Sequence, residues 1–117
     1  MGRFRRSVRQ QDWGHFIVIH VRGELNARNS EELKECVLQI QGARPVILDL
    51  WDVPRCDPAG IAAVKDVQHL LDDQAWACAV VADPGGPCTK ALEDDPEPIG
   101  TYADRRAARS ALHHAAL

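Results

Sequence analysis

The sequence has no apolar run that approaches the ~20 consecutive residues a helix needs to cross a bilayer. It also has no excess of positive charge. The 14 Lys and Arg residues against 17 Asp and Glu give a net charge of −3, which does not favour general nucleic-acid binding. The arginines near the N-terminus are not followed by the apolar stretch of a secretory signal. We therefore expect a cytoplasmic protein whose partners include neither a membrane nor nucleic acid.

Closely spaced cysteines are also absent. The four cysteines form no C-x-x-C pair, so neither a zinc ribbon nor a thioredoxin-type site is predicted. Cys36 and Cys78 fall within apolar patterns and are predicted to be small buried hydrophobic residues. Cys56 and Cys88 fall in turns, where exposed thiols are expected, and nothing obvious near Cys56 would lower the pKa of a reactive thiol. This cysteine usage favours a reducing compartment.

No motif for catalysis or cofactor binding is found. The glycine pair at positions 85 and 86 lies between prolines and is not part of a phosphate-binding loop. Asp49, Asp52 and Asp57 are predicted to lie in a strand, in a turn and at a helix cap, so they do not indicate a metal site. No Ser-His-Asp or Cys-His arrangement can be assigned. We expect a protein that is not an enzyme and that uses no metal or cofactor.

The sequence does contain short apolar strands that alternate with amphipathic helices. A basic lead-in over residues 1–12 is either a solvated tail or an edge strand. Apolar runs predict strands at 15–21, 46–50 and 76–82, and helical spacing predicts helices that begin near residues 30, 58, 88 and 103, the last running to the C-terminus at 117. This order favours a largely parallel sheet in an α/β fold.

Capping residues set the expected helix boundaries. Asn29 or Ser30 is predicted to cap the first helix and Gly42 to end it. Asp57 is predicted to cap the second helix, with Pro58 in its first helical position.

The strand at 15–21 is apolar on both sides. Ile17, Ile19 and Val21 share one side, while Phe16 and Val18 share the other with a histidine at position 20. We therefore expect both faces of the sheet to be covered at this strand.

Three segments in order along the chain resemble the STAS domain, the fold of bacterial anti-sigma-factor antagonists and of anion-transporter C-terminal regions. They are Gly23-Glu24-Leu25-Asn26 after the first strand, the strand at 46–50, and Asp57-x-x-Gly60-Ile61 at the next helix. The resemblance spans about residues 13–112. It implies one domain over residues 1–117, with a mixed, mostly parallel sheet of four or five strands and helices mainly on one face.

The resemblance also implies a function and a surface. Family members bind partners through the region around the start of the second helix, so this chain is similar to an antagonist that binds an anti-sigma factor, of kinase type where the antagonist is regulated. The partner-binding positions that it implies are Gly23, Glu24, Asn26, Val53, Asp57, Pro58, Ala59, Gly60 and Ile61.

The chain departs from the family pattern at the site of regulation. Regulated antagonists carry Asp-Ser-Ser/Thr-Gly at this helix start, and the first Ser is phosphorylated. Asp57 and Gly60 match that motif, but Pro58 stands at the phosphoacceptor position and Ala59 replaces the second hydroxyl residue. Asn26 also stands where an Asp is common in the family.

Hydroxyl side chains are missing from the whole centre of the chain, because no Ser or Thr occurs between Ser30 and Thr89. A phosphate at a helix start would be stabilised by backbone N–H groups and by the helix dipole. Pro58 removes one of those N–H groups together with the hydroxyl. We predict that this surface is not phosphorylated.

Other interpretations remain open at this point. The chain could instead be a STAS domain that senses a ligand or nucleotide, or a subunit of a larger STAS assembly. We expect a monomer or a weak homodimer. Trp51, just after the strand at 46–50, is either a binding hot spot at the rim of the surface or a lid on the core.

Overall fold

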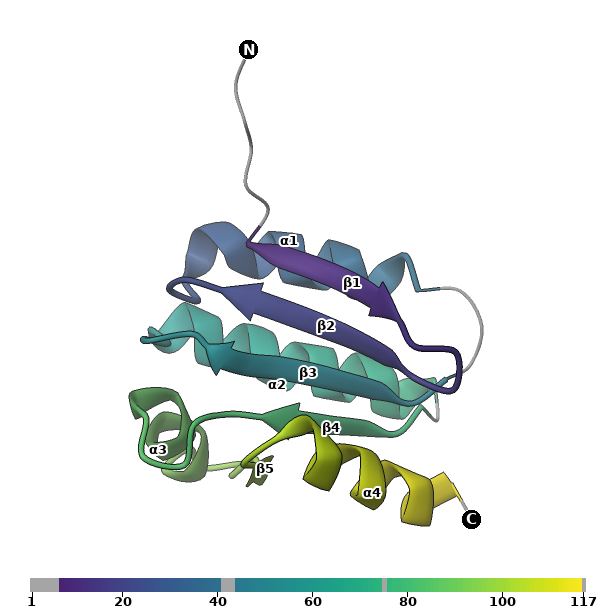
Figure 1. Cartoon of the computed structure of the whole chain (residues 1–117). Coiled ribbons are helices and arrows are strands. Elements are labelled where there is room, and N and C mark those ends of the chain that lie inside the picture. Colours follow the sequence, from purple (N-terminus) through teal and green to yellow (C-terminus); the bar gives the residue numbers. More distant parts are fainter. Residues whose placement is uncertain (1–6, 41–43, 75, 117) are drawn as a thin grey trace.

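A five-stranded sheet organises the chain. The computed structural model describes residues 7–40, 44–74 and 76–116. The sheet has the order β1-β2-β3-β4-β5, which is also the order of the strands along the sequence (Figure 1). The strands are β1 (Val8–Asp12), β2 (Ile17–Arg22), β3 (Val46–Asp52), β4 (Cys78–Val81) and β5 (Thr101–Tyr102). The helices are α1 (Ala27–Leu38), α2 (Pro58–Asp73), α3 (Pro87–Glu93) and α4 (Arg105–Ala116).

The sheet is mixed but mostly parallel. Strand β1 pairs antiparallel with β2, whereas the β2–β3, β3–β4 and β4–β5 pairs are parallel. Helices α1 and α2 lie together on one face, α4 lies on the other, and α3 lies near the β4–β5 side (Figure 1). The predicted α/β fold with a mixed, mostly parallel sheet is confirmed.

Two apolar clusters fill the two sides of the sheet. Ile17, Ile19 and Val21 are fully buried in the larger cluster, under α1 and α2. Phe16 and Val18 belong to the smaller cluster, which two residues of α4, Ala108 and Leu112, cover. The prediction that both faces are covered at β2 is therefore confirmed.

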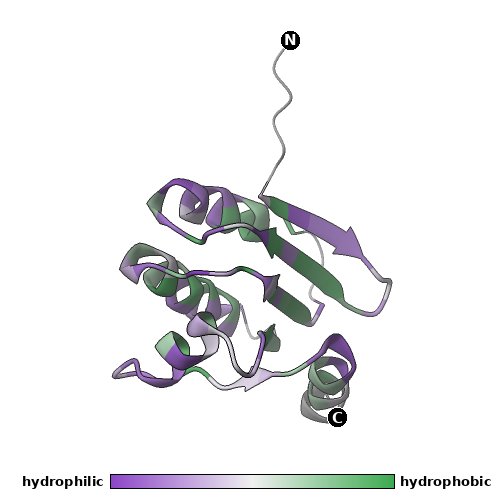
Figure 2. Cartoon of the chain, turned by 60° about the vertical axis from the view of Figure 1, so that its left-hand side comes forward, coloured by the Kyte–Doolittle hydropathy of each residue, from purple (hydrophilic) through white to green (hydrophobic). Residues whose placement is uncertain are grey.

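Strand β1 is the antiparallel edge of the sheet and lies within the basic lead-in. Only Val8 of this strand is buried, and the residues from Arg9 to Asp12 are exposed. Figure 2 shows β1 as mainly hydrophilic beside the hydrophobic β2. A polar edge strand of this kind discourages pairing with a second chain.

Helix α1 begins earlier than predicted. Asn26 is the cap, and its side chain accepts hydrogen bonds from the backbone N–H groups of Arg28 and Asn29. The Asn29 side chain in turn accepts from the Asn26 N–H at 2.8 Å, which completes a capping box. The prediction of Asn29 or Ser30 as the cap was wrong, because both residues are buried within the first turn. The helix ends at Leu38, and the predicted terminator at position 42 lies outside the described residues.

Two further elements differ from the prediction. Asp52 belongs to β3 rather than to the following turn, because the ladder to β2 continues as far as the Arg22–Asp52 pair. Strand β5 was not predicted, since its two residues, Thr101 and Tyr102, are partly exposed and too few to show a period. Among the helices of the described residues, none is long and apolar enough to cross a membrane.

The cysteines also differ from the prediction. Cys56 and Cys88 form a disulfide, with a Cα–Cα distance of 5.4 Å, and Cys88 is buried rather than exposed. Cys36 and Cys78 are partly rather than fully buried, and both pack against the larger apolar cluster. Burial of the Cys78 thiol raises its pKa to about 12. The expectation of exposed thiols failed because the disulfide joins residues 32 apart, which spacing alone does not reveal.

Candidate functional site

The turn at 23–26 and the start of α2 lie side by side. Leu25 and Cys56 form an isolated parallel bridge. The Leu25 N–H donates to the Arg55 carbonyl at 2.9 Å, and the Asp57 N–H donates to the Leu25 carbonyl at 3.1 Å. The fold therefore brings together the two segments that the sequence singled out.

Gly60 allows this approach. A Cβ atom at Gly60 would lie 2.2 Å from the Leu25 carbonyl oxygen, so no larger residue fits without a backbone shift. Gly60 is buried and acts by positioning the start of α2 against the turn. The motif glycine thus has a direct steric explanation.

Gly23 has a different constraint at the other segment. Its φ of +78° lies in the left-handed region, and its N–H donates to the Asp52 carbonyl at 3.3 Å. A glycine therefore takes the chain from β2 into the turn, which aims Glu24 outward and Leu25 into the core.

The nine predicted positions divide by exposure. Val53 and Ile61 are only 5% and 8% exposed and pack in the larger apolar cluster, and Gly60 is buried as well. The remaining six are accessible, and we call them the candidate surface: Gly23, Glu24, Asn26, Asp57, Pro58 and Ala59.

The start of α2 is capped as predicted. The Asp57 side chain accepts a hydrogen bond from the Gly60 N–H at 2.9 Å, and Pro58 occupies the first turn. Pro58 has no N–H and that of Gly60 is already bound, so this helix start offers few groups to hold an added anion.

Ser30 couples the two helices behind the candidate surface. Its hydroxyl donates to the Asn26 carbonyl at 2.5 Å and lies 3.4 Å from the Ala59 carbonyl. The side chain is thereby shared between the first turns of α1 and α2. The sequence suggested Ser30 only as a helix cap and did not indicate this contact.

A shallow groove of about 360 Å³ adjoins the candidate surface between α2 and α3. The groove was not predicted, because half of its lining comes from residues 91–96, an acidic stretch expected to be mostly loop. Its lining residues are Pro58, Ile61, Ala62, Lys65, Ala91, Asp94, Asp95 and Pro96.

Lys65 holds the acidic side of this groove against α2. Its ammonium lies 2.8 Å from an Asp95 carboxylate oxygen and 3.6 Å from a Glu97 carboxylate oxygen. The hydrogen bond from Lys65 lowers the pKa of Asp95, and the same bond raises the pKa of Lys65. The pair therefore stays ionised across the neutral range.

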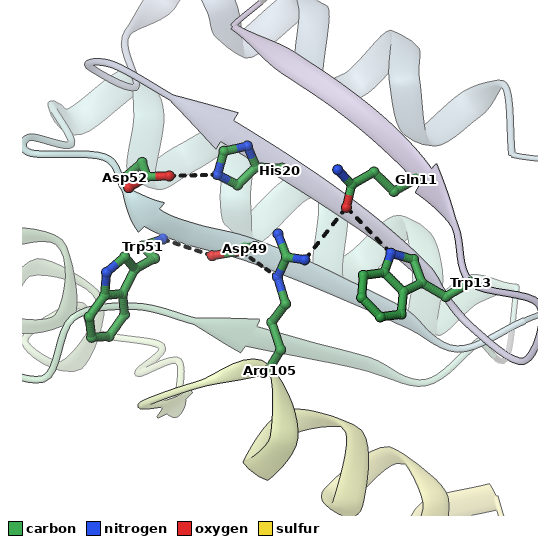
Figure 3. Close-up of polar contacts among 7 residues, drawn as sticks. All are labelled: Gln11, Trp13, His20, Asp49, Trp51, Asp52 and Arg105. Carbon is green, nitrogen blue, oxygen red and sulfur yellow. Dashed lines mark hydrogen bonds and ion pairs between the residues drawn. The ribbon is translucent and has the colours of Figure 1, made fainter.

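Trp51 is not a lid on the core. The residue is 48% exposed and lines a hollow of about 260 Å³ together with His20, Asp49 and Arg105. These residues lie on the α4 face of the sheet (Figure 3). The candidate surface lies instead at the turn after β2 and the start of α2. His20 contacts Asp52, with 2.8 Å between the ring Nε2 and a carboxylate oxygen.

The buried Asp49 is the centre of a polar brace on that face (Figure 3). One carboxylate oxygen accepts from Arg105 Nε at 2.7 Å, and the other accepts from the Trp51 N–H at 3.0 Å. The Arg105 guanidinium also lies 5.8 Å from the Trp13 ring centroid and reaches Gln11. The brace fixes the start of α4 to the sheet.

The described residues contain no group of three His, Cys, Asp or Glu side chains that could hold a metal ion. Asp49, Asp52 and Asp57 each have a different partner within the chain, namely Arg105, His20 and the N–H of Gly60.

Comparisons with known proteins agree with this geometry. The model of the STAS domain family matches residues 7–85. The solved structure of the anti-sigma factor antagonist SpoIIAA in its unphosphorylated form is similar in fold, with a TM-score of 0.65 and 18% sequence identity. The similarity covers 91% of this chain and 97% of that chain. No match was found among curated proteins.

Proposed function

This chain belongs to the STAS domain family, and we propose that it is a non-catalytic interaction module of the anti-sigma-factor antagonist type. In this role it binds an anti-sigma factor through the candidate surface and so releases a sigma factor. Any ATP site belongs to the partner. The proposed setting is the cytoplasm, with the chain as a monomer or a weak homodimer.

The observation that carries this proposal is the main-chain bridge between Leu25 and Cys56. The bridge places the turn at 23–26 beside the first turn of α2, which leaves Glu24, Asp57 and Pro58 exposed together. Because backbone contacts hold this surface, its side chains are available to a partner. The similarity in fold to an anti-sigma-factor antagonist supports the choice of partner.

We further propose that binding is not switched off by serine phosphorylation. Pro58 is exposed where regulated antagonists carry the phosphoacceptor, and it has no hydroxyl. Ser30, the hydroxyl residue behind the surface, is only 5% exposed and donates its hydrogen bond to Asn26. A kinase-type partner would find no accessible acceptor in this surface.

The test is an affinity pull-down of the tagged full chain from its native cells, followed by mass-spectrometric identification. Ala59→Glu adds a charged side chain to the candidate surface, and Ala107→Glu adds the same side chain to an exposed position of α4 as a matched control. We expect an anti-sigma factor with the wild type and with Ala107→Glu, and at least a tenfold loss with Ala59→Glu.

Two results would contradict the proposal in different ways. Recovery of an anti-sigma factor at equal levels from all three proteins would place the interface elsewhere on the chain. Recovery of no anti-sigma factor from any of them would refute the antagonist function itself. A phosphate bound stoichiometrically to the captured chain near α2 would refute the loss of phosphorylation.

A further inference from the structure

We propose that Cys56 and Cys88 form a reversible thiol–disulfide switch that braces the candidate surface. The bond joins the residue before the α2 cap to the start of α3, across a sequence separation of 32. The restraint that the bond places on this surface follows from the structure alone. Its effect on a partner rests on the proposed function.

Cys56 occupies the junction of the two segments of the candidate surface. It pairs with Leu25, and the residues on either side of it, Arg55 and Asp57, make the hydrogen bonds to the Leu25 backbone. A covalent link at Cys56 therefore restrains both segments at once. The link leads to Cys88, which is only 3% exposed and belongs to the larger apolar cluster.

The fold accommodates the reduced state as well. A thiol at Cys88 would be a small apolar side chain within the core. Helix α3 has other anchors: Leu92 is fully buried, its carbonyl accepts from the Ile99 N–H at 3.1 Å, and the Thr89 hydroxyl donates to the Asp83 carbonyl at 2.6 Å. Opening the disulfide therefore loosens the candidate surface without removing α3.

Cys56 and Cys88 are better placed to form a reversible disulfide than the other two cysteines. Cys56 is partly exposed, and its Cα atom lies 5.4 Å from that of Cys88, within the range that a disulfide spans. Cys78 lies in β4 and packs against the larger apolar cluster. Cys36 lies on α1 in a hollow that is lined by residues of β1, α1 and the turn at 23–26. The reactive partner of Cys56 is thus the neighbouring Cys88.

The oxidant is a low-molecular-weight disulfide, and closure proceeds by two exchanges. The Cys56 thiolate attacks one sulfur of the small disulfide, forms a mixed disulfide and releases a thiolate, which takes up the proton that Cys56 lost. The Cys88 thiolate then attacks the Cys56 sulfur and releases the second small thiol in the same way. Two cysteine thiols become one disulfide while one small disulfide becomes two thiols, and excess small thiol reverses both steps.

In this proposal, oxidation of the cysteine pair regulates binding where regulated antagonists use phosphorylation. In a reducing cytoplasm the chain holds two thiols, and oxidation closes the bond. Closure restrains the candidate surface in its folded arrangement, which reduces the ordering required on binding. Oxidation is therefore expected to strengthen binding, by about tenfold, whereas a phosphate would have weakened it.

The test uses the full chain in glutathione buffers from fully oxidised to fully reduced. Alkylation and mass spectrometry give the disulfide fraction, and hydrogen–deuterium exchange is measured in both end states. We expect complete interconversion with retained fold. We also expect the amides of Leu25 and Asp57 to exchange about tenfold more slowly in the oxidised chain.

Single Cys→Ala variants test whether this pair causes the redox dependence. Cys56→Ala and Cys88→Ala should each abolish the redox dependence of exchange, and Cys36→Ala should leave it intact. A bond that stays closed in excess reduced glutathione would overturn the proposal. So would equal exchange in the two states of the wild type.

A binding measurement in both redox states separates this proposal from the proposed function. Redox-dependent exchange with no anti-sigma factor bound in either state would uphold the switch and refute the antagonist function. A bound anti-sigma factor with redox-independent exchange would uphold the function and refute the switch.

Discussion

The two sides of the sheet are fastened to their helices in different ways. At the candidate surface, main-chain hydrogen bonds of Leu25 with Arg55 and Asp57 hold the start of α2 against the turn at 23–26. On the other face, one side chain, Arg105, ties α4 to Asp49. The backbone contacts constrain Gly60 but place little demand on the exposed side chains of the first region. In the second region, the polar contact depends on the identity of two residues and adds to the apolar packing of Ala108 and Leu112.

The largest effect is expected where the main-chain contact requires a glycine. Gly60→Ala places a Cβ against the Leu25 carbonyl oxygen and should lower the free energy of unfolding by about 2–3 kcal/mol. Urea denaturation measures the change. Gly100→Ala is the control, because a Cβ there has no neighbouring atom within 4 Å. Equal stability of the two variants would show that the close approach is not needed.

A smaller loss is expected when the side-chain brace is broken. Arg105→Ala leaves the buried Asp49 carboxylate without its 2.7 Å ion-pair partner and should cost about 2 kcal/mol. Arg106→Ala removes an exposed arginine of the same helix and should cost less than about 0.5 kcal/mol. Thermal unfolding of both variants provides the measurement. An Arg105→Ala variant as stable as the wild type would mean that apolar packing alone holds α4 on the sheet.

The smallest effect concerns the ion pair beside the candidate surface. Hydrogen bonding to Lys65 lowers the Asp95 pKa below its ordinary 3.8, so its contribution to stability is present above that value and is lost as the pH falls. The Lys65 pKa is raised above 10.5, so its contribution is present below that value and is lost as the pH rises through the folded pKa.

Asp95→Asn should therefore flatten the dependence of stability on pH at both the acid and the alkaline end. Chemical denaturation over a pH series provides the measurement. Asp94→Asn is the control, because it removes a neighbouring carboxylate and leaves the Lys65–Asp95 contact in place. Unaltered acid and alkaline slopes in Asp95→Asn would show that the pair does not couple stability to pH.

Local chemistry made much of the fold predictable. Asp57 followed by Pro58 is a strong helix start, and the two-sided apolar pattern from Phe16 to Val21 required cover on both faces of the sheet. The start of α1 was harder to predict, because Asn26, Asn29 and Ser30 can all cap a helix. Packing of the last two residues against neighbouring segments decided among them.

The site was less predictable than the fold. The resemblance named the two segments of the candidate surface, but it did not show that Gly60 works by steric fit or that Val53 and Ile61 are buried. The disulfide and the groove beside α3 both depend on contacts between distant segments. No local pattern reports such contacts, so neither feature was visible in the sequence.

The sheet order has a consequence for how the chain is made. Strand order in space equals strand order in the sequence, so each new strand pairs with the one synthesised just before it. In the sheet of the described residues, no later strand is inserted between two earlier ones. The sheet can therefore grow strand by strand from β1 as the chain leaves the ribosome, and each strand after β1 covers the growing edge that the strand before it left open.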